Sequence, residues 1–156
     1  MAVNMKLGEA LSALKKEKSR LARLILLRKE NVYIDKGKQA KFDPKKLSEE
    51  INKKIDDIRK LKIKIQNTNL KTYVPGENIT LAEAIIKVND MRSKISHLSK
   101  LFEKEKYSFF RDKEEKEIVS QLDEIEVEDD MERLEVEKVQ LDNKIQITNW
   151  TTILVD

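Results

Sequence analysis

Residues 64–72 read KIQNTNLKT and residues 144–152 read KIQITNWTT, so one short stretch occurs twice in the chain at a shift of 80. Further upstream, LGEAL at residues 7–11 corresponds to LAEAI at residues 81–85, at a shift of 74. Apolar positions downstream of the second match also agree, since Leu14, Leu21 and Leu24 align with Val88, Ile95 and Leu98. A self-match of this length predicts two copies of one structural unit.

The apolar residues within each copy recur every three or four positions, which is the spacing of amphipathic helices. We expect helices at about residues 5–33, 43–69, 80–107 and 129–149. Neither helical pair could bury its apolar stripe alone. The sequence therefore predicts one all-α domain over residues 1–156, in which a first hairpin (1–72) and a second hairpin (73–156) stack into an antiparallel four-helix bundle.

Local signals mark several helix ends. Asp43 followed by Pro44 is an N-cap with proline in the first turn. Thr80 and Glu83 have the spacing of a capping box, in which each side chain accepts a backbone N–H of the first turn. Gly37 interrupts the first helical pattern, and the sequence VPG at residues 74–76 predicts a turn between the two hairpins.

The charged connector at residues 108–128 gives a weaker signal than the helices. Ile125 and Val127 alternate with acidic residues, and such alternation is typical of strands. We therefore expect short extended pieces at residues 117–122 and 124–127.

The composition agrees with a helical or coiled-coil protein, since 39% of residues are charged, 5% are aromatic, and there are 3 glycines and 2 prolines. The chain has no cysteine, which excludes disulfides and thiolate metal sites. No apolar run approaches the roughly 18 residues of a membrane helix, and no apolar segment typical of a secretory signal begins the sequence. We expect a cytoplasmic protein.

The formal net charge of +3 conceals a strong asymmetry between the hairpins. Residues 1–72 carry 20 Lys and Arg against 9 Asp and Glu, a net charge of +11. Residues 73–156 carry 12 against 20, a net charge of −8, and most of these acids lie between residues 112 and 142. The asymmetry fits solvated helix faces, attraction between the halves, or a basic surface for a polyanion.

Catalytic chemistry finds little support. His97 is the only histidine, and Lys94 occupies the position that a Glu-x-x-His di-iron motif would need for its carboxylate. Acidic residues three apart could hold Mg²⁺, but one tract supplies nearly all of them, whereas such sites draw carboxylates from several helices. Neither a glycine-rich phosphate loop nor a nucleophile–histidine arrangement occurs. We expect no enzyme activity, no cofactor and no metal.

Nucleic-acid binding is an alternative function, because basic residues are dense on the first two helical segments. They are Lys15, Lys16, Lys18, Arg20, Arg23, Lys53, Lys54, Arg59, Lys60, Lys62 and Lys64. Aromatic residues that could stack on bases are missing among them, and no known reader motif is present. Nucleic acid is therefore the less favoured partner.

The repeated Thr-Asn segment is the one local motif that we consider as a candidate site. Its residues are Asn69, Thr72, Thr148, Asn149, Trp150, Thr151 and Thr152. Asn often ends helices, and Thr and Asn side chains bond neighbouring backbone groups, so the segment can be purely structural, with Trp150 packed over the bundle end. The alternative is a contact surface for another subunit.

Residues 6–11 (KLGEAL) and residues 146–154 (QITNWTTIL) resemble the ends of small bacterial proteins of the septicolysin or septicolysin-like family. The resemblance implies a cytolysin-like, membrane-active protein, but it brings no catalytic residues. The connector departs from that family, since Glu117-Ile118 is followed by Val119-Ser120-Gln121 instead of an early basic residue.

The leading hypothesis is a non-enzymatic bacterial helical-bundle protein that acts by self-association as a homo-oligomer or by binding a protein partner. The two alternatives are the membrane-active toxin that the resemblance implies and a polyanion-binding protein that uses the basic first hairpin.

Overall fold

The computed structural model describes residues 4–102 and 119–155. They form four helices: α1 (Leu7–Glu30), α2 (Pro44–Lys71), α3 (Leu81–Leu98) and α4 (Glu124–Thr151). Helices α1 and α2 pair as one hairpin and α3 and α4 as the other, while α1 also packs on α4 and α2 on α3. The predicted all-α fold of two hairpins packed as a four-helix bundle is confirmed.

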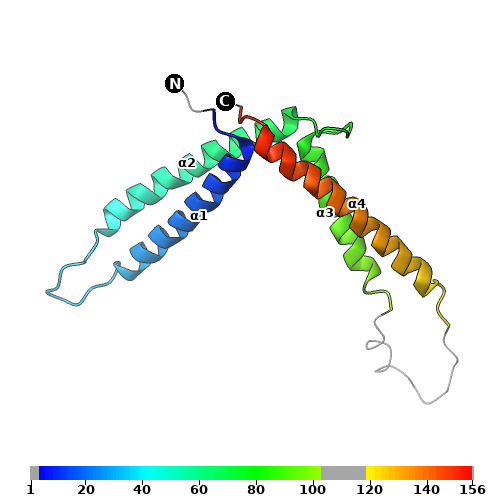
Figure 1. Cartoon of the computed structure of the whole chain (residues 1–156). Helices are drawn as coiled ribbons and strands as arrows, with labels where there is room; N and C mark the ends of the chain where they lie inside the picture. Colours follow the sequence, from blue (N-terminus) through cyan, green and yellow to red (C-terminus); the bar gives the residue numbers. More distant parts are fainter. Residues whose placement is uncertain (1–3, 103–118, 156) are drawn as a thin grey trace, which may run out of the picture.

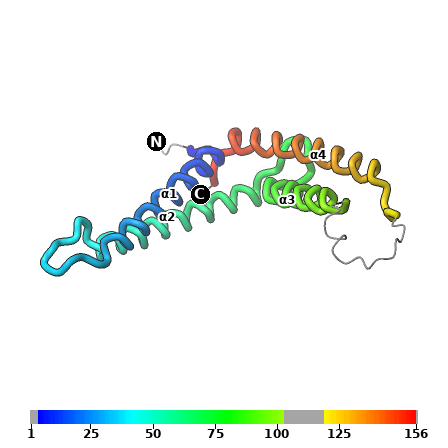
Figure 2. Tube along the Cα trace, turned by 90° about the horizontal axis from the view of Figure 1, so that it is seen from below, coloured from blue at the N-terminus to red at the C-terminus, as the bar shows by residue number. Residues whose placement is uncertain are grey.

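The two hairpins meet at one end and diverge from it as the arms of a V, with both chain termini near the apex (Figure 1). A view turned by 90° shows the arms extending away from the apex in opposite directions (Figure 2). The largest buried cluster draws on all four helices and on the loop between α2 and α3. Its members are Leu7, Ala10, Ile65, Val74, Leu81, Ala84, Val88, Leu141 and Ile145. The main hydrophobic core therefore joins the hairpins, and each arm beyond it is a two-helix seam.

The predicted starts of α2 and α3 are confirmed at their capping residues. Asp43 Oδ1 accepts the Lys45 N–H at 2.8 Å. At the start of α3, Glu83 Oε2 accepts the Thr80 N–H at 2.6 Å and Thr80 Oγ1 accepts the Glu83 N–H at 3.3 Å. Gly76, in the predicted turn, has a φ of +77°, a conformation that favours glycine.

Helix α1 is shorter than expected because Asn31 ends it. The Asn31 N–H bonds to the Arg28 carbonyl at 3.1 Å, and its side-chain amide donates to the Leu27 carbonyl at 2.8 Å. Helix α3 ends at Leu98, and the remainder of the predicted 80–107 segment beyond residue 102 lies outside the described residues.

The predicted extended piece at residues 124–127 is wrong, because α4 begins at Glu124 and not near residue 129. Asp123 is its N-cap: Oδ1 accepts the N–H groups of Ile125 and Glu126 at 2.8 and 3.4 Å. The alternation that resembled a strand is the start of a helix in which Val127 is buried and Ile125 is exposed. Residues 119–122 form no strand either, and residues 117 and 118 lie outside the described part of the chain.

The internal repeat extends over whole helices. Helices α2 and α4 each have 28 residues, and the shift of 80 aligns them end to end, from their N-caps Asp43 and Asp123 to Lys71 and Thr151. None of the helices in the described ranges is both long and apolar enough to span a membrane.

Candidate functional site

The two Thr-Asn segments, which were the predicted interaction or structural motif, both lie at the apex, where α2 and α4 end. Thr72 and Thr152 are the C-caps of α2 and α4. The Leu81 N–H bonds to the Thr72 carbonyl at 2.7 Å, and the Leu7 N–H bonds to the Thr152 carbonyl at 2.9 Å. Each segment therefore ties the end of one helix to the start of the next helix around the apex.

These ties obey a pseudo-twofold relation that the repeat explains. Isolated antiparallel bridges pair Tyr73 with Thr80 and Ile153 with Lys6, and the shifts of 80 and 74 interchange the two pairs. The first bridge lies in the loop from α2 to α3, whereas the second joins the two ends of the chain. No loop connects α4 to α1 in the chain. Backbone hydrogen bonds between the two terminal segments hold these helix ends together instead, as the loop does for α2 and α3.

The threonine hydroxyls at the centre of the apex are buried and bonded. Thr68 and Thr148 donate to the carbonyls of Lys64 and Lys144 at 2.8 and 2.7 Å. Thr68 Oγ1 also accepts the Val155 N–H at 3.1 Å. Thr148 receives no equivalent bond from the first copy, because a shift of 80 places Pro75, which lacks an N–H, at the position of Val155.

Asn149 is buried beside these threonines, Asn69 is half-buried, and Thr151 is exposed with its hydroxyl bonded to the Ile147 carbonyl at 2.9 Å. Trp150 is half-exposed and lies against Gly8 of α1: a Cβ built on Gly8 would be 2.7 Å from Trp150 Cδ2. The equivalent residues in the other copy are Leu70 and Ala82. The larger side chain, Trp150, lies against a glycine, whereas the smaller residue at its equivalent position, Leu70, corresponds to an alanine partner in sequence. The motif therefore fits the apex by shape.

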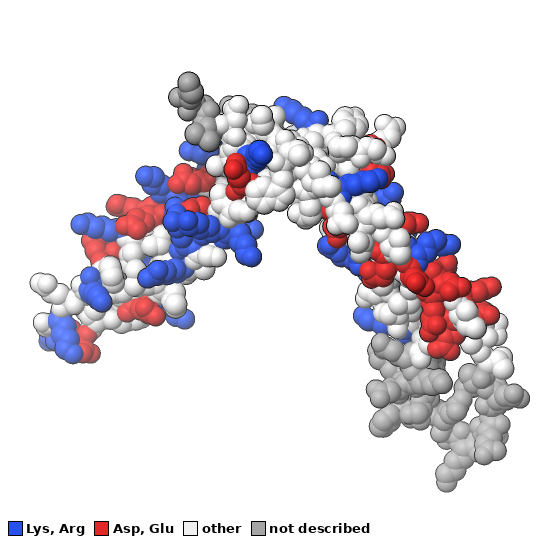
Figure 3. All heavy atoms as spheres, viewed as in Figure 1, with Lys and Arg blue, Asp and Glu red and all other residues white. Residues whose placement is uncertain are grey.

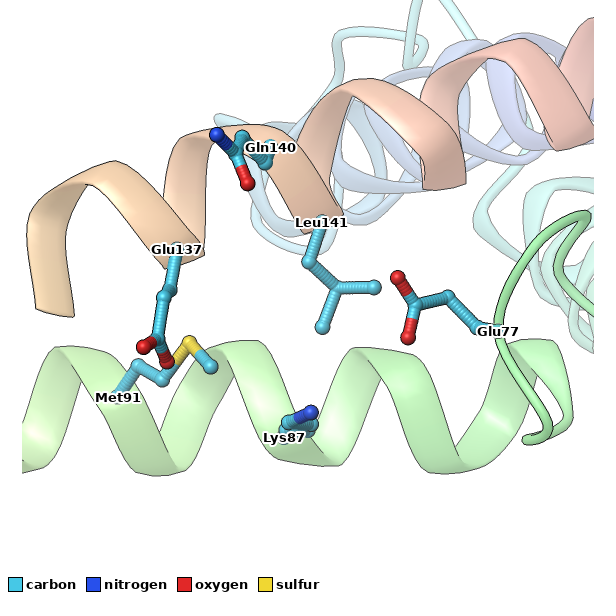
Figure 4. A pocket seen from close by; sticks show the side chains of 6 residues that line it. All are labelled: Glu77, Lys87, Met91, Glu137, Gln140 and Leu141. Atoms are coloured by element: carbon cyan, nitrogen blue, oxygen red, sulfur yellow. The ribbon is translucent and has the colours of Figure 1, made fainter.

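A small hollow lies between α3 and α4, with a volume of about 160 Å³ (Figure 4). Leu141 points from α4 toward α3, Glu77 enters from the preceding loop, and Glu137 lies beside Met91 (Figure 4). Lys144 Nζ bonds to Glu77 Oε1 at 2.6 Å, and this bond, with the nearby Lys87 charge, lowers the pKa of the Glu77 carboxyl. The bonded carboxylate at the rim links the loop to α4.

This hollow is smaller than the roughly 300–1,000 Å³ of usual small-molecule sites. A second hollow of about 280 Å³ also borders Lys87. Glu83 lines it, but the Glu83 carboxylate accepts the Thr80 N–H in the cap of α3. Within residues 4–102 and 119–155, no three His, Asp or Glu side chains are grouped so as to hold a metal ion.

The basic residues of the first hairpin are dispersed among acidic ones (Figure 3). Glu17 of α1 binds Lys54 of α2 at 2.6 Å and Arg20 at 2.7 Å, and these bonds, that from Lys54 foremost, lower the pKa of Glu17. Arg59 pairs with Asp56 at 2.7 Å. Part of the predicted basic surface is thus used within the hairpin, although Lys53 and Lys60 are exposed on α2.

Sequence reasoning missed a second apolar face on α4. Val136 lies nine residues from Val127 and from Ile145, which is two and a half turns at about 3.6 residues per turn, so it projects opposite to these buried residues. Ile125 and Ile147 are each eleven residues from Val136, or about three turns, and share its side of the helix. With Val139 and Trp150 they form what we call the outer face of α4.

The five side chains of this outer face are 50–69% exposed. The helix that carries them has 9 Asp and Glu against 3 Lys and Arg, and acidic side chains are visible on the lower part of the second arm (Figure 3). The eleven-residue recurrence of Ile125, Val136 and Ile147 was present in the sequence, but it becomes a helical signal only once Asp123 is identified as the cap.

Comparison with known proteins places the chain in a family without identifying an activity. The chain belongs to the family of unknown function DUF6847, which matches residues 13–154. It is similar to the crystal structure of a functionally unknown conserved protein from Corynebacterium diphtheriae, with 26% identity and a TM-score of 0.83, covering 97% of this chain and 99% of the other. No curated protein matches the sequence.

The predicted resemblance to septicolysin is therefore wrong. The family match and the structural neighbour both concern proteins of unknown function, and neither points to septicolysin. The terminal motifs on which the resemblance rested are explained by the apex itself, since both lie in the backbone ties between α4 and α1.

Proposed function

We propose that this member of the DUF6847 family is a non-enzymatic helical scaffold that acts by self-association. The observation that supports this function is the large apolar surface that the V-shaped chain leaves exposed, above all along the outer face of α4. Binding to a different protein is the alternative use of the same surface. A cytoplasmic location is part of the proposal.

The accessible surface area supports the proposal quantitatively. The chain exposes 13050 Å², whereas a compact monomer of 18.3 kDa exposes about 8,100 Å². If the residues outside the described ranges, about 2.5 kDa, are assigned the area of a fully extended chain, about 3,600 Å², roughly 9,400 Å² remains for the described residues. A compact monomer of their mass, about 15.8 kDa, exposes about 7,300 Å², so an excess of roughly 2,100 Å² is left. That excess is comparable to the area that a stable protein–protein interface buries.

The charge distribution favours a second copy as the partner. Helices α1 and α2 carry 16 Lys and Arg against 7 Asp and Glu, while α4 carries 3 against 9. Opposite potentials on the two arms steer encounter and disfavour pairing of like arms. Such steering weakens with salt, because the Debye length falls from about 10 Å at 0.1 M to about 3 Å at 1 M.

The test is the mass of the full chain in solution, measured by sedimentation equilibrium over a range of protein concentrations at low and at high salt. We expect a multiple of 18.3 kDa at low salt and weaker association at high salt. A monomer at every concentration and both salts would refute self-association. The exposed basic residues of α2 would then direct attention to a polyanion, which a salt-dependent RNA- or DNA-binding titration would detect.

A further inference from the structure

Helix α4 carries an aligned stripe of five exposed apolar residues on the side opposite its buried ones. Val127, Leu141 and Ile145 are buried in the hairpin, whereas Ile125, Val136, Val139, Ile147 and Trp150 form the exposed outer face. Isolated exposed apolar residues are ordinary on a protein surface, but an aligned stripe along a helix is typical of an interface.

The repeat supplies an internal comparison for this stripe. At a shift of 80, α2 has Lys45, Asp56, Arg59 and Asn67 where α4 has Ile125, Val136, Val139 and Ile147. Asp56 and Arg59 form an exposed ion pair at 2.7 Å on α2. The fold therefore tolerates polar residues at these four positions, and the hairpin does not require the stripe of α4 to be apolar there. The fifth member of the stripe, Trp150, corresponds to the apolar Leu70.

The acidic residues beside the stripe favour a partner with a basic surface. Glu128, Asp129 and Glu132 are exposed on the side of α4 that carries the stripe, toward its N-terminal end. A basic surface with its own exposed apolar residues would complement it. The first hairpin has both features, since Ile25, Leu26, Ile55 and Ile63 are exposed among its lysines and arginines.

We propose that the outer face of α4 is the docking surface for the basic α1/α2 hairpin of a second copy of this chain, in a reciprocal dimer. This inference rests on the proposed function and names its interface. In the reciprocal arrangement, α4 of each protomer lies on the first hairpin of its partner. Each protomer thus contributes two surfaces.

The dimensions of the helix favour reciprocity. The 28 residues of α4 span about 42 Å at 1.5 Å per residue, and a face about 10 Å wide gives roughly 420 Å². A stable interface buries about 800 Å² per partner. One contact falls short of this area, whereas two contacts related by a twofold axis reach it.

The first experiment replaces residues of the stripe by their counterparts in α2, as Val136→Asp, Val139→Arg and Ile147→Asn in one variant. Sedimentation equilibrium should give a dimer dissociation constant raised at least about a hundredfold, because buried apolar anchors dominate binding energy. The matched control is Ile86→Ser, which replaces an equally exposed residue of α3 by its counterpart in α1, Ser12. The control should dimerise as the unsubstituted chain does, and circular dichroism should show unchanged helicity in both variants.

The second experiment identifies the partner surface by charge reversal. One variant carries Glu128→Lys and Glu132→Lys on α4, and the other carries Lys53→Glu and Lys60→Glu on α2. Each variant alone should dimerise weakly, because like charges then face each other. An equimolar mixture should regain the dimer, because a basic α4 meets an acidic hairpin at one contact and the original pair remains at the other.

The outcomes separate this inference from the proposed function. If the unsubstituted chain is monomeric, the proposed function fails. If it dimerises and the α4 substitutions leave the dissociation constant unchanged, the function stands and the α4 interface is refuted. If only the Glu-to-Lys variant is weakened and the mixture is not restored, α4 packs on another α4 or on a different surface, and the proposed partner is refuted.

Discussion

The contact between Gly8 and Trp150 gives a prediction that can be worked out from the structure. Gly8→Ala would place a Cβ 2.7 Å from Trp150 Cδ2 and 2.8 Å from Cε3, whereas carbon atoms pack best at about 3.5–4.0 Å. The ring must move by close to 1 Å, or α1 must shift against α4. Trp150 is 51% exposed, so its ring can move outward, but only by giving up part of its contact with α1.

The expected cost follows from two opposing terms. Overpacking costs about 1–3 kcal/mol, and half of a tryptophan side chain, about 120 Å², is worth about 3 kcal/mol at 25 cal/mol per Å², which sets the upper bound. Alanine gains up to about 1 kcal/mol over glycine in a helix. We therefore expect Gly8→Ala to lower the free energy of unfolding by about 1–2 kcal/mol. In a Trp150→Leu background the same change should raise it by about 0.5–1 kcal/mol, because only the propensity term remains.

The assay is a double-mutant cycle by urea unfolding, followed by far-ultraviolet circular dichroism at high salt and a fixed low protein concentration. A change of sign for Gly8→Ala between the two backgrounds supports the reasoning, and the coupling free energy should be about 2 kcal/mol. The control is Ala82→Gly, which should be destabilising by about 0.5–1 kcal/mol whatever residue occupies position 150. Equal effects of Gly8→Ala in both backgrounds would refute the shape argument.

Three further predictions concern caps and charges. Thr80→Ala should lower the free energy of unfolding by about 1 kcal/mol in urea titrations, because it removes both hydroxyl bonds with Glu83. Asp123→Ala should cost about the same and reduce helicity measured by circular dichroism, whereas no loss of helicity is expected if α4 began near residue 129. The pKa of Glu17 is lowered in the folded chain, so its stabilisation is present above the unfolded pKa and is lost as pH falls through the folded pKa. Thermal melts should therefore fall less steeply at acid pH for Glu17→Gln than for the unsubstituted chain, and an identical pH slope would contradict the assigned bond with Lys54.

Much of the fold could be predicted because its signals are local. Asp43 and Thr80 have the chemistry of helix caps, and the apolar spacing after each follows the helical period. The self-match of residues 64–72 and 144–152 then required two hairpins of the same kind. Caps and helical periods depend on neighbours in the sequence, and the self-match is visible by comparing the sequence with itself, so a single sequence displays these features.

The errors had two sources: an ambiguous local pattern and contacts between residues far apart in the sequence. The start of α4 was missed because Ile125 and Val127 alternate in polarity, and alternation over four residues cannot separate a strand from a helix with two apolar sides. Applying the shift of 80 as far as Asp43 would have found the cap at Asp123. The backbone ties at the apex, such as that between Leu7 and Thr152, join segments far apart in the sequence, and no spacing rule predicts them.

The geometry of the V limits the ways in which a basic arm and an acidic arm can associate. Suppose that α4 of one copy packs on the first hairpin of a second copy, but α4 of the second copy does not pack on the first. The growing assembly then has a free first hairpin at one end and a free α4 at the other, and each can bind a further copy. Such a heterologous contact propagates into an open series, whereas a twofold axis closes it after two chains. The mass should therefore stop at twice 18.3 kDa as concentration rises. A mass that continues to grow would mean that the same complementary arms associate head to tail instead of reciprocally.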